Sequence, residues 1–255
     1  MKRIWSKDET ILALYLYYQI PFGKIHSTNS EIIKLANLIG RTPSAVCMKM
    51  CNLARFDKTL ANRKVSGLKN GSKMDEYIWT EFEGRIGTLV AESNKILNYY
   101  LSGSEVVYEE SIDNYIPKGN DINIMSRGRR GQDFFRRAVL SAYNYKCCIT
   151  NVSIPELLIA SHIKPWKDSD DDTEKLNPRN GLCLNAFFDK AFDTGLITLS
   201  QQYRIIISKR VKNECTNESD QYYFLKYEGK QINLPEKFKP DITYIEYHND
   251  MIFKG

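Results

Sequence analysis

Four side chains in the second half of the chain have types and spacings suited to hydrolysing a phosphodiester bond. His162 is one of only three histidines and lies near the end of an apolar run that begins at Leu157. Asn180 follows after a polar loop, and Asp189 and Asp193 come after it. Because residues four apart on a helix share a face, the two carboxylates are expected to project together.

Phosphodiester cleavage needs a base to activate water, positive charge to neutralise the transition state, and a group to stabilise the leaving oxygen. A histidine near its unperturbed pKa suits the first task. A divalent cation held by carboxylates supplies the other two. The residues therefore indicate metal-dependent hydrolysis. Taken alone, His162 is more simply interpreted as a structural histidine, as are His26 and His248, which have no such neighbours.

The elements around these residues are predicted from apolar spacing and turn residues. A helix is expected near residues 134–143, and a polar loop at 164–180. A helix at 182–193 is closed by Gly195. The expected strands cover residues 145–150, 157–163, 196–199 and 203–208, with further strand-like runs in 222–255. The acidic run at 168–172 is interpreted as a solvated loop.

Residues 131–200, little over a quarter of the chain, resemble the HNH endonuclease superfamily, in the branch found among restriction endonucleases. Four motifs in the right order carry the resemblance. They are Cys148-Ile149-Thr150-Asn151, Ala160-Ser161-His162-Ile163-Lys164-Pro165-Trp166, Asn177-Pro178-Arg179-Asn180-Gly181-Leu182-Cys183-Leu184 and Phe188-Asp189-Lys190-Ala191-Phe192-Asp193-Thr194-Gly195-Leu196-Ile197.

The resemblance implies a ββα-metal fold, in which two strands and a helix surround one divalent cation. It makes His162 the general base and Asn180 the residue that braces the loop and so orients the histidine. It places Asp189 and Asp193 at helix positions that bind the metal. The residue before the base is often an Asp or His ligand in the family, but here it is Ser161.

A second departure lies in the helix motif, where relatives often have Leu-His-Asp and this chain has Phe187-Phe188-Asp189. The expected ligands are then Asp189, Asp193 and Ser161, and oxygen ligands favour Mg²⁺ or Mn²⁺ over Zn²⁺. No Cys-x-x-Cys pair occurs, which argues against a four-cysteine zinc site.

The first part of the chain is predicted to form three short helices. Ser6 with Glu9 forms a capping box, and Ser30 is expected to cap the second helix. Residues 40–43, Gly-Arg-Thr-Pro, end that helix and start the third. Two helices joined by a tight glycine turn indicate a helix-turn-helix. Its outward candidates for DNA are Ser44, Lys49, Asn52 and Arg55. The alternative is a three-helix bundle that binds nothing.

The chain has 255 residues and a net charge of +5, which is mild, but five arginines cluster between residues 127 and 137. Arg127, Arg129 and Arg130 are candidates for binding phosphates, with a solvated helix face as the alternative. Lys164, Arg179 and Lys190 are further candidates for phosphate or leaving-group contacts. No apolar run reaches membrane-spanning length and no secretory signal begins the chain, so a cytoplasmic protein is expected.

Together these observations predict an α+β protein in three parts. Residues 1–66 form a helix-turn-helix DNA-recognition domain. Residues 67–125 form a linker and a long helix at 74–101, serving as a spacer or a dimer contact. Residues 126–255 form the HNH nuclease domain with a C-terminal strand extension.

The expected function is restriction of foreign double-stranded DNA, modified or not, by a homodimer that cuts both strands. The alternatives are a mobile-element or homing nuclease, and a DNA-binding regulator whose HNH domain is degenerate.

Overall fold

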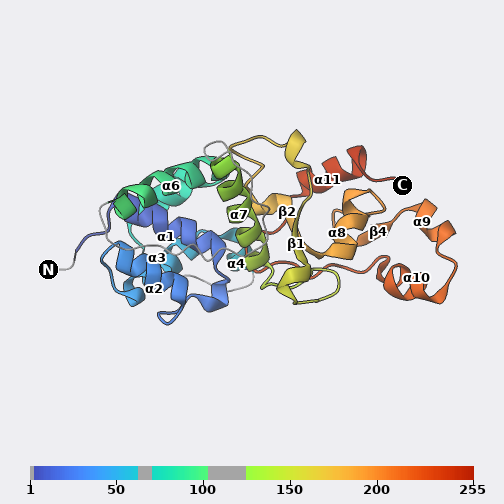
Figure 1. Ribbon diagram of the computed structural model, residues 1–255, viewed down its shortest axis with the longest axis horizontal. Coiled ribbons are helices and arrows are strands. Elements are labelled where there is room, and N and C mark those ends of the chain that lie inside the picture. The colour runs from blue at the N-terminus through green and yellow to red at the C-terminus, as the bar shows by residue number, and fades with distance from the viewer. Residues whose placement is uncertain (1–2, 63–70, 103–124) are drawn as a thin grey trace. The chain divides into compact units, whose positions relative to one another are not determined.

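The computed structural model describes residues 3–62, 71–102 and 125–255 (Figure 1). In the helix that begins at Met125, side chains are described from Arg130 onward. The structure contains two compact units, residues 1–134 and residues 135–255. The first is helical and the second holds two small sheets, so the chain is α+β. The start and the end of the linker region expected at 67–125 lie outside the described residues.

The first unit is built from amphipathic helices whose apolar faces form a shared core. They are α1 (Lys7–Gln19), α2 (Ser30–Leu38), α3 (Pro43–Ala54), α4 (Lys58–Asn62), α5 (Lys73–Phe82) and α6 (Ile86–Ser102), with a 3-10 turn at Phe22–Lys24. Helix α1 contacts α2, α3, α5 and α6, and Leu12, Leu14 and Tyr17 on it are fully buried. The three expected helices of the first 54 residues are therefore present.

The helix starts follow the local sequence closely. Ser6 and Glu9 form the predicted capping box of α1, and Thr42 caps α3 with Pro43 at its first position. The prediction that Ser30 caps α2 is wrong by one residue. Asn29 is the cap, because its side chain accepts hydrogen bonds from the two backbone N–H groups that follow Ser30.

The single long helix expected at 74–101 is instead two helices, α5 and α6. Ser72 caps α5 with a capping box, and the chain turns at Gly84. Gly84 has φ +78°, a left-handed conformation that favours glycine and cannot continue a right-handed helix. The glycine therefore ends one helix and allows the next to start at Ile86.

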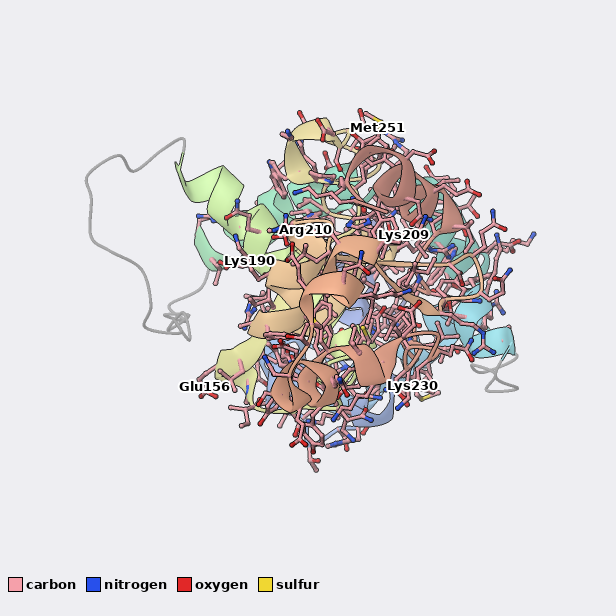
Figure 2. The ribbon with its side chains drawn as sticks, turned by 90° about the vertical axis from the view of Figure 1, so that its right-hand side faces the viewer. Glu156, Lys190, Lys209, Arg210, Lys230 and Met251 are labelled. Carbon is pink, nitrogen blue, oxygen red and sulfur yellow. The ribbon has the colours of Figure 1, made fainter. Side chains whose placement is uncertain are left out.

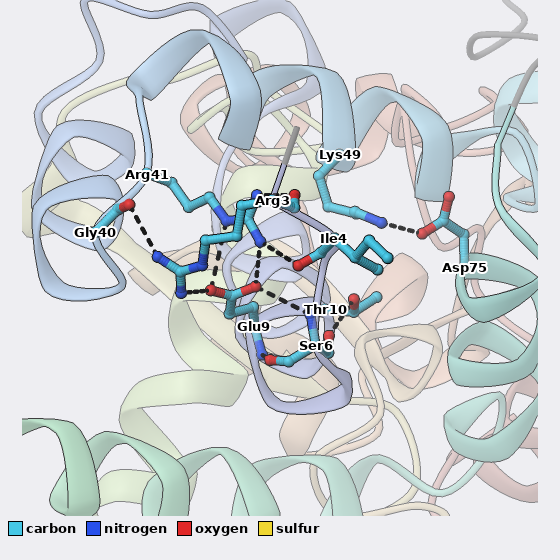
Figure 3. A network of polar contacts seen from close by, with 9 residues as sticks. All are labelled: Arg3, Ile4, Ser6, Glu9, Thr10, Gly40, Arg41, Lys49 and Asp75. Atoms are coloured by element: carbon cyan, nitrogen blue, oxygen red, sulfur yellow. Dashed lines mark hydrogen bonds and ion pairs between the residues drawn. The ribbon is translucent and has the colours of Figure 1, made fainter. Parts of the chain in front are cut away.

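A buried ion cluster joins the start of α1 to the turn between α2 and α3 (Figure 3). Glu9 is 1% exposed and accepts hydrogen bonds from Arg3 and Arg41 and from the backbone N–H of Ser6. Burial alone would raise the pKa of Glu9, but the Arg41 and Ser6 hydrogen bonds outweigh it and lower that pKa. The guanidinium of Arg41 also reaches the carbonyls of Arg3 and Ile4.

The second unit is organised around an antiparallel strand pair. Strand β1 (Leu158–His162) pairs with β2 (Gly181–Asn185), with Ser161 opposite Leu182 and His162 opposite Gly181. Helix α8 (Ala186–Asp193) follows β2 directly, is capped by Asn185 and contacts both strands. A second pair, β3 (Ile197–Leu199) and β4 (Ile205–Ile207), follows. Helix α7 (Met125–Ala142) spans the division between the units.

Three sequence predictions in this unit are wrong. Residues 145–150 form turns rather than a strand, because Asn144, Tyr145 and Asn151 have positive φ and bend the chain. Cys147 and Cys148 in this segment are both buried. Residues 182–193 are not one helix, since residues 181–185 pair with β1 before α8 begins.

The third error is the C-terminal strand extension. Within residues 209–255, all of which the structure describes, the regular elements are helical. They are α9 (Lys209–Glu214), α10 (Glu218–Tyr223), a 3-10 turn at Leu225–Tyr227 and α11 (Ile242–Met251). The helices start at Ser208, Asn217 and Asp241, whose side chains cap them. Only an isolated bridge from Arg204 to Gln231 has strand character there.

No helix within the described residues is long and apolar enough to cross a membrane.

Candidate active site

His162 ends β1 and is held from three sides. Its ring stacks on Phe135 with centroids 3.8 Å apart and an interplanar angle of 11°. Trp166 meets the ring edge-on at 5.5 Å. The Nε2 atom lies 2.9 Å from the backbone carbonyl oxygen of Lys175. These contacts hold the imidazole in one orientation, which a catalytic base needs.

The Lys175 contact also determines the tautomer of His162. A carbonyl oxygen only accepts hydrogen bonds, so Nε2 must carry the proton and the neutral ring has its lone pair on Nδ1. Among the hydrogen bonds of the described residues, none involves Nδ1 of His162. Burial lowers the pKa of this histidine, and the Lys175 carbonyl opposes that effect. The ring therefore presents an unprotonated nitrogen at neutral pH.

His248 is packed in a similar way, but both of its ring nitrogens have hydrogen-bond partners. It is 1% exposed and stacks on Phe192 with centroids 3.7 Å apart. Its Nε2 lies 3.1 Å from the carbonyl of Phe192 and its Nδ1 lies 2.8 Å from the hydroxyl of Thr198. Both ring nitrogens are thus occupied by the fold, which agrees with the interpretation of His248 as structural.

Asn180 is fully buried at the base of the loop that follows His162. Its Oδ1 accepts from the backbone N–H of Lys164 at 2.8 Å, and its Nδ2 donates to the Lys164 carbonyl at 3.1 Å. The same amide donates to Ser169 Oγ, and the Asn180 carbonyl accepts from the N–H of Ile163. Asn180 therefore ties both ends of the 163–180 loop to the end of β1.

Three oxygen-bearing side chains gather where β1 meets α8. Burial raises the pKa of Asp189, and the nearby Ser161 hydroxyl and Lys190 charge oppose that rise. Asp193 is more exposed than Asp189, and partial loss of solvent around its carboxyl raises its pKa, with the Asp189 charge adding to that rise. The buried Oγ of Ser161 makes no hydrogen bond of good geometry, although it lies close enough to Asp189 to moderate that carboxyl's pKa. Two carboxylates that repel each other beside an unsatisfied hydroxyl are suited to a cation.

The candidate residues form two groups rather than one. Ser161 and His162 are consecutive on a strand, so their side chains point to opposite faces of the pleat. No polar or electrostatic interaction of the described residues joins His162 to Asp189 or Asp193. Among all the described residues, no group of three or more His, Cys, Asp or Glu residues is arranged to hold a metal.

Phe188 stands where relatives often have a histidine, and the structure shows what it does instead. Its ring is buried and stacks on Phe224 at 6.0 Å and 9°. It also meets Tyr227 edge-on at 5.1 Å, while Phe187 contacts Phe224 at 5.6 Å. Phe188 thus attaches the segment that contains α10 to helix α8.

The candidate phosphate contacts differ in how far they are already engaged. Lys164 forms an ion pair with Glu174 at 2.5 Å and lies over the ring of Tyr247. Arg179 is half-buried and Lys190 is exposed, and neither forms an ion pair with a described residue. Arg130 is exposed on α7. The side chains of Arg127 and Arg129 lie outside the described residues.

In the first unit, α2 and α3 are joined by residues 39–42, with Gly40 at φ +64°. Of the four outward candidates on α3 and at its end, Ser44 is exposed, and Asn52 and Arg55 are half-buried. Lys49 does not point outward, and that prediction is wrong. It is 4% exposed and forms a 2.5 Å ion pair with Asp75 at the start of α5 (Figure 3).

Three contributors to the site are absent from the sequence predictions. Phe135 was expected only as part of an apolar helix face, and no sequence pattern links it to His162. The Lys175 contact uses a backbone carbonyl, to which residue type is no guide. Gly181 is the third, since a Cβ there would lie 2.4 Å from Val139 and 3.0 Å from Phe135. Its place in the Asn-Gly-Leu motif was a signal that could have been used.

The chain is similar to a known protein family and, distantly, to solved structures. Residues 147–200 match the family described as HNH endonuclease. A solved structure described as "Modification dependent TagI restriction endonuclease" is similar at 15% identity with a TM-score of 0.30. The similarity covers 48% of this chain and 38% of that one, so the chain spans well under half the length of that structure. No curated protein matches the chain.

Proposed function

We propose that the HNH endonuclease domain which this chain carries at residues 147–200 hydrolyses phosphodiester bonds of double-stranded DNA. His162 is the general base. The observation that supports this role most directly is the orientation of its ring, with Nε2 bonded to the Lys175 carbonyl and Nδ1 without a partner among the described residues. A base whose pKa lies below its usual range is unprotonated at neutral pH and ready to take a proton from water.

Each residue of the candidate site has a separate role in this proposal. Nδ1 of His162 accepts the proton, and Phe135 and the Lys175 carbonyl keep the ring from turning. Asn180 holds the loop whose Lys175 carbonyl orients the base. Arg179 and Lys190 are the proposed phosphate contacts, since neither forms an ion pair with a described residue.

The residues present fit a hard divalent cation, Mg²⁺ or Mn²⁺ rather than Zn²⁺. Asp189 and Asp193 would hold it, with the otherwise unsatisfied Ser161 hydroxyl beside them. One or two carboxylates suffice for Mg²⁺, because this ion keeps several waters and binds substrate phosphate. When bound, it would supply charge neutralisation at the phosphate and the leaving oxygen.

The proposal extends to the whole chain as a cytoplasmic restriction enzyme. Helices α2 and α3 would form a helix-turn-helix, with Ser44, Asn52 and Arg55 as its DNA-contacting residues and Arg127, Arg129 and Arg130 adding phosphate contacts. A homodimer would bring one nuclease site to each strand.

The separation of His162 from Asp189 favours a second candidate function, a DNA-binding regulator with a degenerate nuclease domain. His162 and Asp189 would have to act on the same phosphate from opposite faces of β1. They can do so only if the substrate extends beyond the end of the strand, where His162 lies. The two functions differ in whether the purified protein cuts DNA.

The deciding experiment is cleavage of supercoiled plasmid with Mg²⁺ or Mn²⁺, on modified and unmodified DNA. The wild type should relax or linearise plasmid, and His162→Ala should be slower by about a hundredfold or more, the usual contribution of a general base. His26→Ala is the matched control, because His26 is exposed and its ring contacts the Thr28 hydroxyl. If the wild type binds every substrate and cuts none, the regulator is the better description.

A further inference from the structure

The second unit exposes an aromatic surface edged with lysines. Tyr222 and Tyr223, at the end of α10, are each 62% exposed, and Phe187 on α8 is 53% exposed. Large aromatic side chains usually bury most of their area in the core, so three exposed together need an explanation. We call Phe187, Tyr222, Tyr223, Lys226 and Lys230 the aromatic–lysine surface.

The fold holds this surface firmly. Buried Phe224 lies between Phe187 and Phe188, contacting the first edge-on and stacking on the second. Tyr227 packs edge-on against Phe188. The rings of Tyr222 and Tyr223 meet edge-on at 5.1 Å. The exposed rings are therefore presented by an anchored segment.

The charges on the surface identify the class of partner. Lys226 lies over Tyr222 at 3.8 Å and over Tyr227 at 5.1 Å, and Lys230 lies 5.7 Å from the Tyr227 ring. Neither lysine forms an ion pair in the described part of the chain. Glu228, which lies between them in sequence, is already paired with Lys212 at 2.7 Å. Flat apolar rings interleaved with unpaired cations match a polyanion that also has flat faces, which is a nucleic acid.

One residue of the surface, Phe187, is on helix α8, which also carries the candidate metal ligands. Phe187 and Lys190 are three residues apart and so lie on the same side of that helix, and the Lys190 charge acts on both Asp189 and Asp193. Figure 2 looks onto this end of the unit and labels Lys190 and Lys230, which lie on opposite sides of the view. Asp189 is two residues from Phe187 and faces another side of the helix, so the surface and the carboxylates share α8 without sharing a face.

We propose that the aromatic–lysine surface binds single-stranded DNA on the unit that carries the nuclease site, with Tyr222 and Tyr223 stacking on unpaired bases. This inference rests on the proposed nuclease function. The single-stranded state follows from the chemistry, because bases in a duplex are stacked on each other and offer no free face to a tyrosine. Glu218 and Asp220 lie on the same helix, so binding depends on the lysines to offset them.

The test is the affinity of the full chain for a fluorescein-labelled oligo-dT and for a labelled hairpin duplex, by anisotropy in EDTA so that nothing is cut. Tyr222→Ala/Tyr223→Ala should weaken oligo-dT binding at least tenfold and leave duplex binding within twofold. Tyr222→Phe/Tyr223→Phe keeps the rings and should bind like wild type. Lys226→Ala/Lys230→Ala should reduce the slope of log affinity against log salt by about 1.4, which is about 0.7 for each phosphate that a lysine no longer neutralises.

Tyr99→Ala is the control, since Tyr99 is 76% exposed in the other unit. Circular dichroism and thermal unfolding would show that each variant is folded. Unchanged oligo-dT affinity in the double alanine variant, or an equal weakening on duplex, would overturn the inference. Because binding is measured without metal, this outcome is separate from plasmid cleavage. A protein that cuts plasmid but shows no effect at the tyrosines refutes only the surface.

Discussion

At the scale of single residues, two histidines in similar packing have different capabilities. His162 and His248 each stack on a phenylalanine and each bond a backbone carbonyl through Nε2. The hydroxyl of Thr198 occupies Nδ1 of His248, whereas Nδ1 of His162 has no partner in the described chain. One unoccupied ring nitrogen is what separates a candidate base from a structural residue.

The first prediction concerns the pH dependence of cleavage. The active form of His162 is neutral, and burial lowers its pKa below the ordinary 6.5. The cleavage rate should therefore rise with pH and reach half its plateau below pH 6.5. Phe135→Leu removes the stacked ring and admits water, so its midpoint should shift upward toward 6.5.

The measurement is plasmid nicking from pH 4.5 to 8.5 at saturating metal, for wild type and Phe135→Leu. Acid release of metal from Asp189 and Asp193 would lower both curves together, so the difference between them reports on the histidine. A midpoint that does not move in the variant would count against His162 as the titrating base.

At the scale of elements, a single glycine decides that residues 73–102 are two helices. Gly84 has φ +78° and a Cβ there would meet nothing within 4 Å. Gly84→Ala should therefore lower the free energy of unfolding by about 1 kcal/mol or more, and only through backbone strain. Gly23 also has open space around it, but no positive φ.

Gly23→Ala is thus the matched control and should be neutral or slightly stabilising. Urea unfolding of both variants measures the two effects. Equal changes at Gly23 and Gly84 would show that the turn does not depend on the left-handed conformation.

The ion pair between α3 and α5 supports a second prediction at this scale. Lys49 and Asp75 are almost fully buried, so removing one partner leaves a buried charge unpaired. Lys49→Met should cost about 3 to 5 kcal/mol of unfolding free energy. Lys34→Met, which breaks an exposed pair with Glu31, should cost less than about 1 kcal/mol.

Thermal and urea unfolding would distinguish the two lysines. If Lys49→Met unfolds like wild type but binds duplex DNA more weakly, then Lys49 contacts DNA after all.

At the scale of the whole molecule, the free energy of unfolding should depend on pH, because the folded protein keeps His248 unprotonated. Burial lowers the pKa of His248 from 6.5 to about 4, with the Phe192 carbonyl opposing the shift. The unfolded chain therefore binds this proton more readily, so stability is full above pH 6.5 and falls as the pH drops toward 4. A single group of this kind costs about 1.4 kcal/mol per pH unit within that window.

Unfolding free energy should consequently fall by about 2 kcal/mol between pH 6.5 and 5, measured by urea titration. His248→Gln should be less stable at pH 7 but show a shallower decline. The carboxylates of Asp189 and Asp193 act in the opposite sense, since their raised pKa values favour the folded state as pH falls. A wild-type profile that is flat over this range would contradict the prediction.

The sequence by itself determined what is local or carried by a motif. Capping at Ser6 and Thr42 depends on side chains bonding backbone groups within three residues. The HNH region was identified from its motifs and is confirmed by the family match. The catalytic and metal roles inferred from those motifs remain predictions.

Tertiary structure alone decided whatever depends on partners distant in sequence. Residues 181–185 form a strand because they pair with β1. Lys49 points inward because it pairs with Asp75, which is 26 residues away in the sequence. The tail is helical where its strand-like runs suggested strands. Phe224 and Tyr227 pack on Phe188, and helix α11 packs against strand β3. The tautomer of His162 depends on a backbone carbonyl 13 residues away. Contacts at such separation leave no periodic signal in a sequence, because their energy comes from burial and geometry that exist only once the chain has folded.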